Sequence, residues 1–266
     1  MTTRNLNLRK KLAVTAVVLA ALGGGSQAMA AAEYFTYDFD GIAGGSTAYA
    51  NGMSATSSES LQAISATQFS GVGWVQFTSL NSGSSSISGT AYSDTGLYAI
   101  FSLTNTLLSG TFGAPLSLYT LNSLDITLMR DVNGDNGFVQ GDAVANITAN
   151  VNNTSDDQNL GTATLLPGTG VAALLTSGAA SLNAEASVAM TPTGLTYFIS
   201  PSPFYDLAFA GFNATGGSYS FDAASGRLSI GNAIGAVDFH NSVPEPASLA
   251  LVGLGLLGFA ASRRRR

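Results

Sequence analysis

Short runs of alternating apolar and polar residues recur along the chain, and Gly, Asn, Ser or Asp bounds each run. A period of two is typical of strands that bury one face, and the bounding residues favour turns. Strands are therefore predicted at residues 34–39, 73–78, 97–103, 124–129, 143–151, 181–190, 195–199, 205–212, 218–222, 227–231 and 236–240. Roughly ten to twelve short strands with regular turns predict an all-β fold, namely a single-domain antiparallel β-sandwich or jelly-roll-like body.

Three other local features complete this expectation. Residues 57–66 and the Ala/Leu-rich residues 170–180 could form short helices that cap the sandwich. Residues 223–226 (AASG) separate two strand-like runs and predict a hairpin with Gly226 closing its loop.

The N-terminal residues have the three regions of a secretory signal peptide. Four cations fall within the first eleven residues, and the apolar run 12–22 follows them. Ala28 and Ala30 then fit the small-x-small cleavage rule, so signal peptidase is expected to cut after Ala30, with Ala32 as the second choice. No twin-arginine pair is present, which favours the general secretory route. An uncleaved N-terminal anchor is the alternative, disfavoured because the apolar run is short.

The predicted mature body, residues 31–242, is strongly acidic. It holds two basic residues, Arg130 and Arg227, and fifteen acidic ones, so its net charge is about −13. Such a body is not expected to bind nucleic acid, which requires a basic surface. The chain has no cysteine. An exported fold of this kind must then be held by a hydrophobic core, without disulfides.

The last residues form a three-part tail. A Pro-Glu-Pro motif comes first, sixteen mostly apolar residues follow, and four arginines end the chain; the motif and the arginines are Val243, Pro244, Glu245, Pro246, Arg263, Arg264, Arg265 and Arg266. The apolar part would form a helix about 24 Å long, short of the ~30 Å bilayer core. Terminal arginines stay in the cytoplasm, so the body lies on the outer side of the membrane. The two prolines hold Glu245 in an extended conformation, accessible to a processing enzyme.

This tail, residues 243–266, closely resembles the PEP-CTERM sorting signal. The resemblance implies a substrate of exosortase, a membrane-embedded processing enzyme, in a Gram-negative bacterium that makes exopolysaccharide. It also implies transient anchoring in the inner membrane by the short transmembrane helix, followed by release to the cell surface or extracellular matrix. A permanent tail anchor is the alternative interpretation.

Three further segments, residues 96–101 (GLYAIF), 124–136 (LDITLMRDVNGDN) and 194–212 (GLTYFISPSPFYDLAFAGF), resemble flocculation-associated PEP-CTERM proteins of the PepA type. The resemblance implies a role in holding cells and exopolysaccharide together in flocs or biofilm. It brings no catalytic residues with it.

Residues 131–142 resemble a calcium loop in their spacing. Asp131, Asn133, Asp135 and Asp142 occupy its positions 1, 3, 5 and 12, where oxygen ligands are needed. Position 6 is Asn136 instead of Gly, position 12 is Asp instead of Glu, and no clear helices flank the loop. Binding of Ca²⁺ and a plain Asx-rich turn both remain open, and no other cofactor is expected.

Few residues could support an enzyme. Without cysteine, and with the only histidine, His240, expected in an exposed region beside the tail, Cys–His and Ser–His–Asp catalysis are not expected. A glycosidase needs only two carboxylates. However, Glu33, Glu59 and Glu185 are the only glutamates of the body, and none sits in a context that suggests a raised pKa. The chain is therefore expected not to be an enzyme.

Aromatic rings could bind sugar. The candidates are Trp74, Phe204 and Tyr205. Phe204 and Tyr205 follow a Ser-Pro-Ser-Pro stretch that predicts an exposed loop. The alternative is that all three rings are core residues. We therefore expect an exported matrix protein with a structural or adhesive role in flocculation or biofilm, in contact with exopolysaccharide. The alternatives are a carbohydrate-binding module and, less favoured, a glycoside-active enzyme.

Overall fold

The computed structural model describes residues 33–42, 45–175, 179–214 and 219–241, and these residues form mainly β-strands. Eleven strands belong to one antiparallel sheet. They are β3 (Gly52–Ala63), β4 (Gln68–Ser82), β5 (Ser85–Ser86), β6 (Leu97–Ser109), β7 (Ser117–Arg130), β10 (Gln158–Leu165), β11 (Val171–Leu174), β12 (Ala180–Met190), β14 (Leu207–Ala214), β15 (Tyr219–Asp222) and β16 (Arg227–His240). The predicted all-β, antiparallel class is confirmed.

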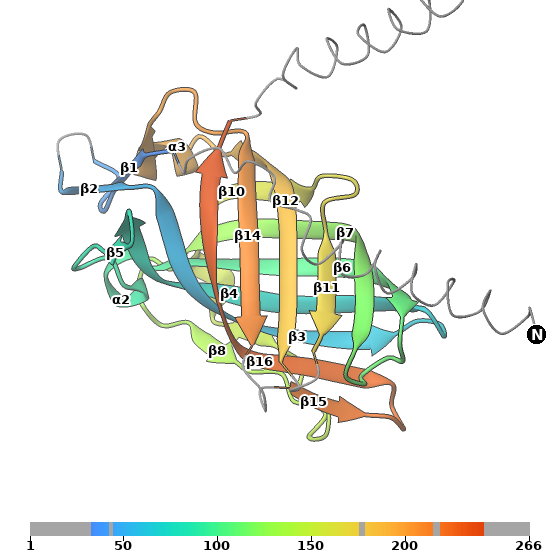
Figure 1. The fold of residues 1–266 in the computed structure, drawn as a ribbon. Coiled ribbons are helices and arrows are strands. Elements are labelled where there is room, and N and C mark those ends of the chain that lie inside the picture. The colour runs from blue at the N-terminus through green and yellow to red at the C-terminus, as the bar shows by residue number, and fades with distance from the viewer. Residues whose placement is uncertain (1–32, 43–44, 176–178, 215–218, 242–266) are drawn as a thin grey trace, which may run out of the picture. The chain divides into compact units, whose positions relative to one another are not determined.

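The large sheet closes on itself. Its strands are hydrogen-bonded in the order β7-β6-β4-β3-β16-β14-β12, and β10 and β11 each pair with β12 on one side and β7 on the other. The ring thus has eight positions, one of them shared by β10 and β11. In Figure 1, β16, β14, β12 and β11 lie in front of β3, β4, β6 and β7 and cross them. The predicted sandwich or jelly roll of separate sheets is not confirmed, because the strands of both sides are hydrogen-bonded into one sheet.

Smaller elements surround this closed sheet. A three-stranded sheet has the order β13-β1-β2, and a two-stranded sheet joins β8 and β9. These elements and the short helices are β1 (Phe35–Asp38), β2 (Thr47–Ala50), β13 (Phe198–Ser200), β8 (Gly137–Val139), β9 (Asn150–Asn152), α2 (Tyr92–Thr95), α3 (Gly194–Tyr197) and the 3₁₀-helix η1 (Thr154–Asp156). Within the described ranges, every helix is too short or too polar to traverse a bilayer. The predicted signal helix and C-terminal helix lie outside these ranges.

Two aromatic clusters fill opposite ends of the closed sheet. The first, here the Phe69 cluster, lies where β4 begins and β6 ends, and consists of Phe69, Phe112, Tyr119 and Phe221. The second, the Phe198 cluster, lies where β16 ends, and consists of Phe35, Tyr37, Phe198, Phe204 and Phe239. The β1-β2-β13 sheet contributes three of its rings and so packs against that end of the body.

Both stretches predicted as short helices contain strands instead. Residues 57–63 belong to β3, where Ser58 and Ser60 are buried on the outer face while Leu61 is buried on the inner face. Burial on both faces removes the apolar–polar alternation that marks a strand. In residues 170–180, Val171–Leu174 form β11, and Ala180 begins β12. A short Ala/Leu-rich run does not distinguish a buried strand from a helix.

The remaining strand predictions are mostly confirmed, with three corrections. Residues 143–146 form a turn instead of a strand, closed by a bridge between Asp142 and Ile147, and the next strand, β9, begins only at Asn150. The predicted strand at residues 195–199 begins within α3. The runs 227–231 and 236–240 belong to one strand, β16, whose register shifts at a bulge between Ile230 and Ala233. The predicted hairpin is confirmed, because Asp222 pairs with Arg227 across its loop.

Candidate functional site

An outer segment, residues 131–157, leaves the end of β7, packs on the outside of the closed sheet and returns at β10. Its contact with β3 explains why two serines are buried there. The Oγ of Ser58 accepts a hydrogen bond from the N–H of Gly141 at 3.0 Å, and the Oγ of Ser60 accepts one from Ala149 at 2.9 Å. Buried polar groups need such partners, so the two hydroxyls hold the segment by its backbone.

An aromatic contact holds the same segment at β8. The indole N–H of Trp74 donates to the carbonyl of Val139 at 2.8 Å. The ring of Phe138 stands edge-to-face against Trp74, Tyr92 and Tyr98, with centroid distances of 5.1, 5.1 and 5.7 Å. Trp74 is only 3% exposed. Its position is that of a core residue, and it does not support the predicted sugar contact.

Asp131 organises the turn that opens the outer segment. Its carboxylate accepts hydrogen bonds from the N–H groups of Asn133 (3.1 Å), Gly134 (2.7 Å) and Asn136 (3.2 Å), and from the hydroxyl of Tyr92. Burial by itself would raise the pKa of Asp131, but these donors more than offset it and hold the pKa below its usual value. The chain's own donors therefore satisfy this carboxylate.

A second carboxylate lies beside the turn. Asp157 accepts hydrogen bonds from the hydroxyl of Tyr98 and from the Nδ2 of Asn136, the latter at 2.8 Å. The Nδ2 of Asn133 donates to Asp156 at 2.7 Å. Two buried oxygens, Oδ1 of Asn136 and Oδ1 of Asp157, have no hydrogen-bond partner within the described part of the chain. A water molecule would supply the missing hydrogen bond.

The four predicted calcium ligands differ in burial and in hydrogen-bond partners. Asp131 is buried and Asn133 contacts Asp156, whereas Asp135 is exposed. Asp142 accepts two backbone N–H groups of its own turn. Across the described ranges, no group of three or more His, Cys, Asp or Glu side chains is arranged to hold a metal ion. The geometry is that of Asx turns, and Ca²⁺ binding stays a prediction.

Phe204 and Tyr205 are also core residues. They are 8% and 6% exposed. Phe204 packs edge-to-face against Phe198 and Phe239 at 5.2 and 5.1 Å. The hydroxyl of Tyr205 donates to the carbonyl of Tyr34 at 2.6 Å. The preceding Ser-Pro-Ser-Pro stretch is largely exposed, but it directs both rings inward, so neither has an open face for a sugar.

The exposed aromatic surface lies instead on the β1-β2-β13 sheet. Tyr34 and Tyr49 are 40% and 61% exposed, and their rings stack with centroids 4.6 Å apart and planes 8° from parallel. Tyr49 lies opposite Thr36, and Thr47 shares its face of β2. We call these four residues the tyrosine platform. No sequence motif marks the tyrosine platform, although the alternation in residues 34–39 places Tyr34 and Thr36 on the face opposite the buried rings of Phe35 and Tyr37.

His240 is not in an exposed region as predicted. It is the last residue of β16, where the predicted strand 236–240 also ends, and it pairs with Leu207. Its Nε2 is 3.1 Å from Oε1 of Glu185, and both side chains are about four-fifths buried. In the described part of the chain, no hydrogen bond joins His240 to a serine hydroxyl.

A family model of the PEP-CTERM protein-sorting motif matches residues 242–266. The chain carries a PEP-CTERM sorting signal. This signal marks an exported protein that exosortase processes at the C-terminal end in association with the membrane. No curated protein and no solved structure matches the chain. The residues of the PEP-CTERM signal, and Ala28 and Ala30 of the predicted signal peptide, lie outside the described residues.

Proposed function

We propose that this protein is a non-enzymatic component of the extracellular matrix that contacts exopolysaccharide through its tyrosine platform. The observation that carries the proposal is the stacked, exposed pair of Tyr34 and Tyr49 on a body that bears an export and sorting signal. Tyrosine combines an apolar ring with a polar hydroxyl, which suits it to surfaces that bind amphipathic partners such as sugars. The hydroxyls of Thr36 and Thr47 on the same face add hydrogen-bonding groups.

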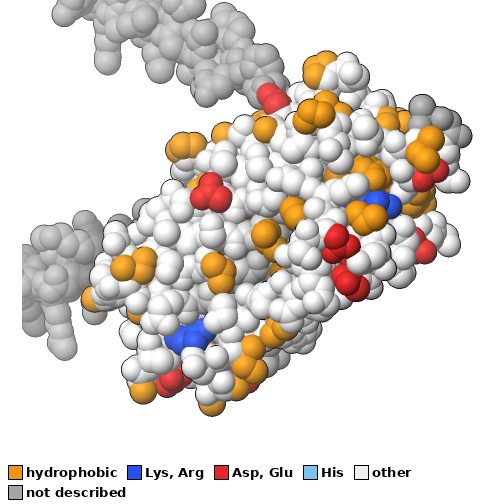
Figure 2. All heavy atoms as spheres, turned by 180° about the vertical axis from the view of Figure 1, so that it is seen from behind, with side chains coloured by type: hydrophobic (Ala, Val, Ile, Leu, Met, Phe, Trp, Pro, Cys, Tyr) orange, Lys and Arg blue, Asp and Glu red, His pale blue; other side chains and the backbone are white. Residues whose placement is uncertain are grey.

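The surface chemistry supports this role. Figure 2 shows one face on which charged side chains are few, and most of the surface consists of uncharged polar side chains and backbone. A body with a net charge of about −13 would repel an anionic polymer at long range. Contact through neutral rings and hydroxyls avoids the cost of bringing carboxylates close to such a polymer. Divalent cations would weaken the repulsion further.

The specific role in flocculation rests on the resemblance of residues 96–101, 124–136 and 194–212 to PepA-type proteins. In the structure, parts of these segments form β6, β7, α3, β13 and β14. They therefore belong mostly to the body itself. The proposed adhesive surface lies on the β1-β2-β13 sheet, which includes β13 and contacts α3.

A pull-down with the host's exopolysaccharide, with and without Ca²⁺, tests the proposal. The protein purified from the host should be retained on the polymer, and Tyr49→Ala should reduce retention roughly two- to tenfold, because a lost aromatic contact costs about 0.5–1.5 kcal/mol. Tyr49→Phe keeps the ring and is the matched control, which should bind nearly as well as the native protein. If the native protein is not retained in either condition, the adhesive role is wrong and a scaffold role remains.

Two observations on the host separate the alternatives. A matrix role predicts that deletion of the gene disperses flocs while exopolysaccharide is still made, and that a Tyr49→Ala copy restores flocculation less well than a Tyr49→Phe copy. A glycoside-active enzyme would instead change the chain length of the polymer, and such a change would contradict our proposal.

A further inference from the structure

The interior of the closed sheet contains an apolar cavity in two adjoining parts. Each part has a volume of about 70 Å³, and five residues line both: Val75, Leu124, Ile126, Ala210 and Phe212. Tyr119 of the Phe69 cluster lines the first part, and Phe239 of the Phe198 cluster lines the second. The two parts together approach the ~150 Å³ of an apolar cavity known to bind benzene.

The sequence of the inner face explains why this space is open. Gly73 lies directly opposite Glu59 in the β3–β4 pair, and Gly71 lies opposite Leu61. Neighbouring side chains cover both glycines, because a Cβ at Gly73 would meet the ring of Phe101 and a Cβ at Gly71 would meet Leu61 and Leu103. The open space lies instead where the lining contains many alanines, among them Ala172, Ala173, Ala180, Ala184, Ala186 and Ala208. A closed sheet of eight positions encloses enough volume for one small ligand when its inner side chains are small.

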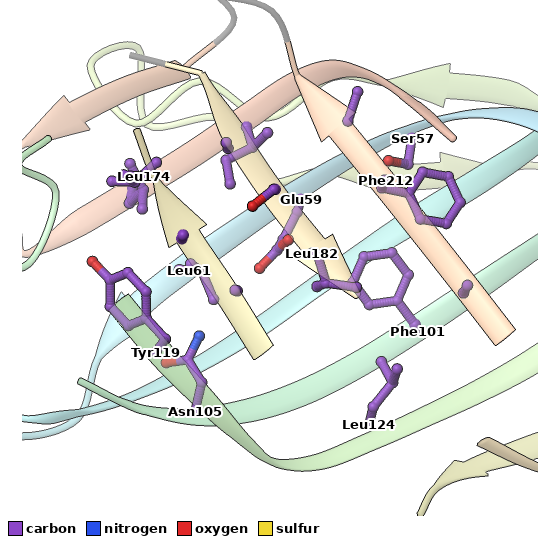
Figure 3. A pocket seen from close by; sticks show the side chains of 18 of the residues that line it. Ser57, Glu59, Leu61, Phe101, Asn105, Tyr119, Leu124, Leu174, Leu182 and Phe212 are labelled. Atoms are coloured by element: carbon purple, nitrogen blue, oxygen red, sulfur yellow. The ribbon is translucent and has the colours of Figure 1, made fainter. Parts of the chain in front are cut away.

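Among the polar side chains that line this space, Glu59 and Asn105 carry oxygens without a partner in the described ranges. The carboxyl group of Glu59 makes no hydrogen bond or ion pair within the described ranges, and it lines the first part of the cavity. Asn105 is 2% exposed, lines the same part, and its Oδ1 has no hydrogen-bond partner there. Figure 3 shows both side chains among the strands that surround the cavity, with Tyr119 next to Asn105. The hydroxyl of Tyr119 donates to Ser117 and is already satisfied.

Unpartnered groups of this kind are unfavourable in a folded protein. A buried acceptor without a donor loses its hydration and gains nothing in return. Burial raises the pKa of Glu59 to about 7, so near neutral pH a large share of this side chain is a neutral acid that can both donate and accept. A water molecule is held well only with two to four polar partners, whereas the lining around these two groups is mainly apolar.

We propose that this cavity is a binding site for a small apolar molecule that carries one hydroxyl group. The apolar body would lie among Leu124, Ile126 and Phe212, and the hydroxyl would satisfy Glu59 and Asn105. Such a ligand resembles an aromatic or short aliphatic alcohol in size and chemistry. The proposal does not depend on the tyrosine platform, which lies on the separate β1-β2-β13 sheet.

Binding of benzyl alcohol, with toluene as the matched ligand that lacks the hydroxyl, tests the proposal. Both are titrated against protein purified from the host, and saturable binding is measured by calorimetry and by the shift in Tm. Benzyl alcohol should bind at least about tenfold more tightly than toluene, because only the alcohol satisfies the buried polar groups. Absence of saturable binding by either ligand, or equal affinity for both, would overturn the proposal.

Two variants locate the site. Glu59→Leu should remove most of the preference for the alcohol while toluene still binds. Ala210→Leu adds side-chain volume where the two parts of the cavity meet and should weaken both ligands. If Ala210→Leu does not fold, the affinities of Glu59→Leu for benzyl alcohol and toluene test the proposal by themselves. An unchanged preference for benzyl alcohol in Glu59→Leu contradicts the assignment.

Discussion

The indole N–H of Trp74 donates to the carbonyl of Val139 at 2.8 Å, which joins a strand of the closed sheet to the outer segment. Trp74 is the only tryptophan of the chain. Its fluorescence therefore reports directly on the contact between residues 131–157 and the sheet. A buried indole with an edge-to-face neighbour emits at shorter wavelength than one reached by water.

The first prediction concerns that neighbour. Phe138→Ala should shift the emission of Trp74 to longer wavelength and destabilise the protein by about 1–3 kcal/mol, because it removes a half-buried ring that contacts three others. Val132→Ala, an exposed position in the same segment, is the control and should leave both quantities nearly unchanged. Urea unfolding followed by fluorescence measures both, and an unchanged emission maximum in Phe138→Ala would refute the role of the ring.

The second prediction compares two glycines with left-handed backbones. Gly96 has φ +65° and Gly134 has φ +75°. A Cβ at Gly96 would overlap the carbonyl oxygen of Asp131, whereas a Cβ at Gly134 would meet no atom within 4 Å. Gly134→Ala should therefore cost only about 1 kcal/mol of left-handed strain. Gly96→Ala should cost at least about 2 kcal/mol more. Equal unfolding free energies for the two variants would show that the backbone at Gly96 moves freely.

The third prediction is a pH dependence of stability. The pKa of Glu59 is raised by burial to about 7 in the folded state, above the ordinary value of 4.5 that applies to the unfolded chain. Between these values the folded state binds more protons, so the free energy of unfolding falls as the pH rises from 4.5 to 7. The loss amounts to at most about 3 kcal/mol. Burial also raises the pKa of Tyr119, which shares the cavity and stays neutral throughout.

Glu59→Gln tests this dependence. The substitution should remove the part of the decrease in unfolding free energy that Glu59 causes. The variant should therefore be more stable than the native protein at pH 8, and the difference in unfolding free energy should be smaller at pH 4. Asp94→Asn removes a charge from an exposed position and serves as the control. Urea unfolding at pH 4, 6 and 8 gives the result, and parallel curves for Glu59→Gln and the native protein would be incompatible with a buried acid.

The fourth prediction concerns Asp131. Asp131→Ala leaves three backbone N–H groups and the Tyr92 hydroxyl without their acceptor, and should destabilise the protein by about 2–4 kcal/mol. Asp131→Asn keeps one oxygen acceptor and should cost less. Because the pKa of Asp131 is lowered in the folded state, its contribution is present at neutral pH and is lost as the pH falls through that lowered pKa. Acid unfolding of the three proteins measures the effect.

The sequence predicts strands best where one face meets the core and the other meets solvent. β12 (Ala180–Met190) shows this alternation, and the predicted strand 181–190 matches it to within one residue. β6 begins at Leu97 as predicted but continues to Ser109, beyond the predicted end at residue 103. β3 lacks this alternation, because Ser58 and Ser60 are buried under the outer segment while Leu61 is buried inside. Closure of the sheet depends on the pairing of β10 and β11 with both β7 and β12, and strand periodicity contains no information on such partners.

The candidate sites show the same limit. The sequence marks Asp131 as the start of an acidic turn, but its donors include Tyr92, which no local pattern connects with it. The sequence also draws attention to Trp74, Phe204 and Tyr205, but the burial of their rings depends on contacts with distant strands. Glu59 appeared unremarkable because its raised pKa arises from the closed interior and not from neighbours in sequence.

Ring closure also has a consequence for the order of events during secretion. β3 begins at Gly52 and remains without one of its two neighbours until β16, which ends at His240, pairs with it. Almost the entire chain must therefore emerge from the translocation channel before the sheet can close. Closure joins two strands that are far apart in the sequence, and such contacts form slowly. The PEP-CTERM signal begins at residue 242, directly behind this closing strand. The strand that closes the sheet therefore lies next in sequence to the signal that exosortase processes in association with the membrane.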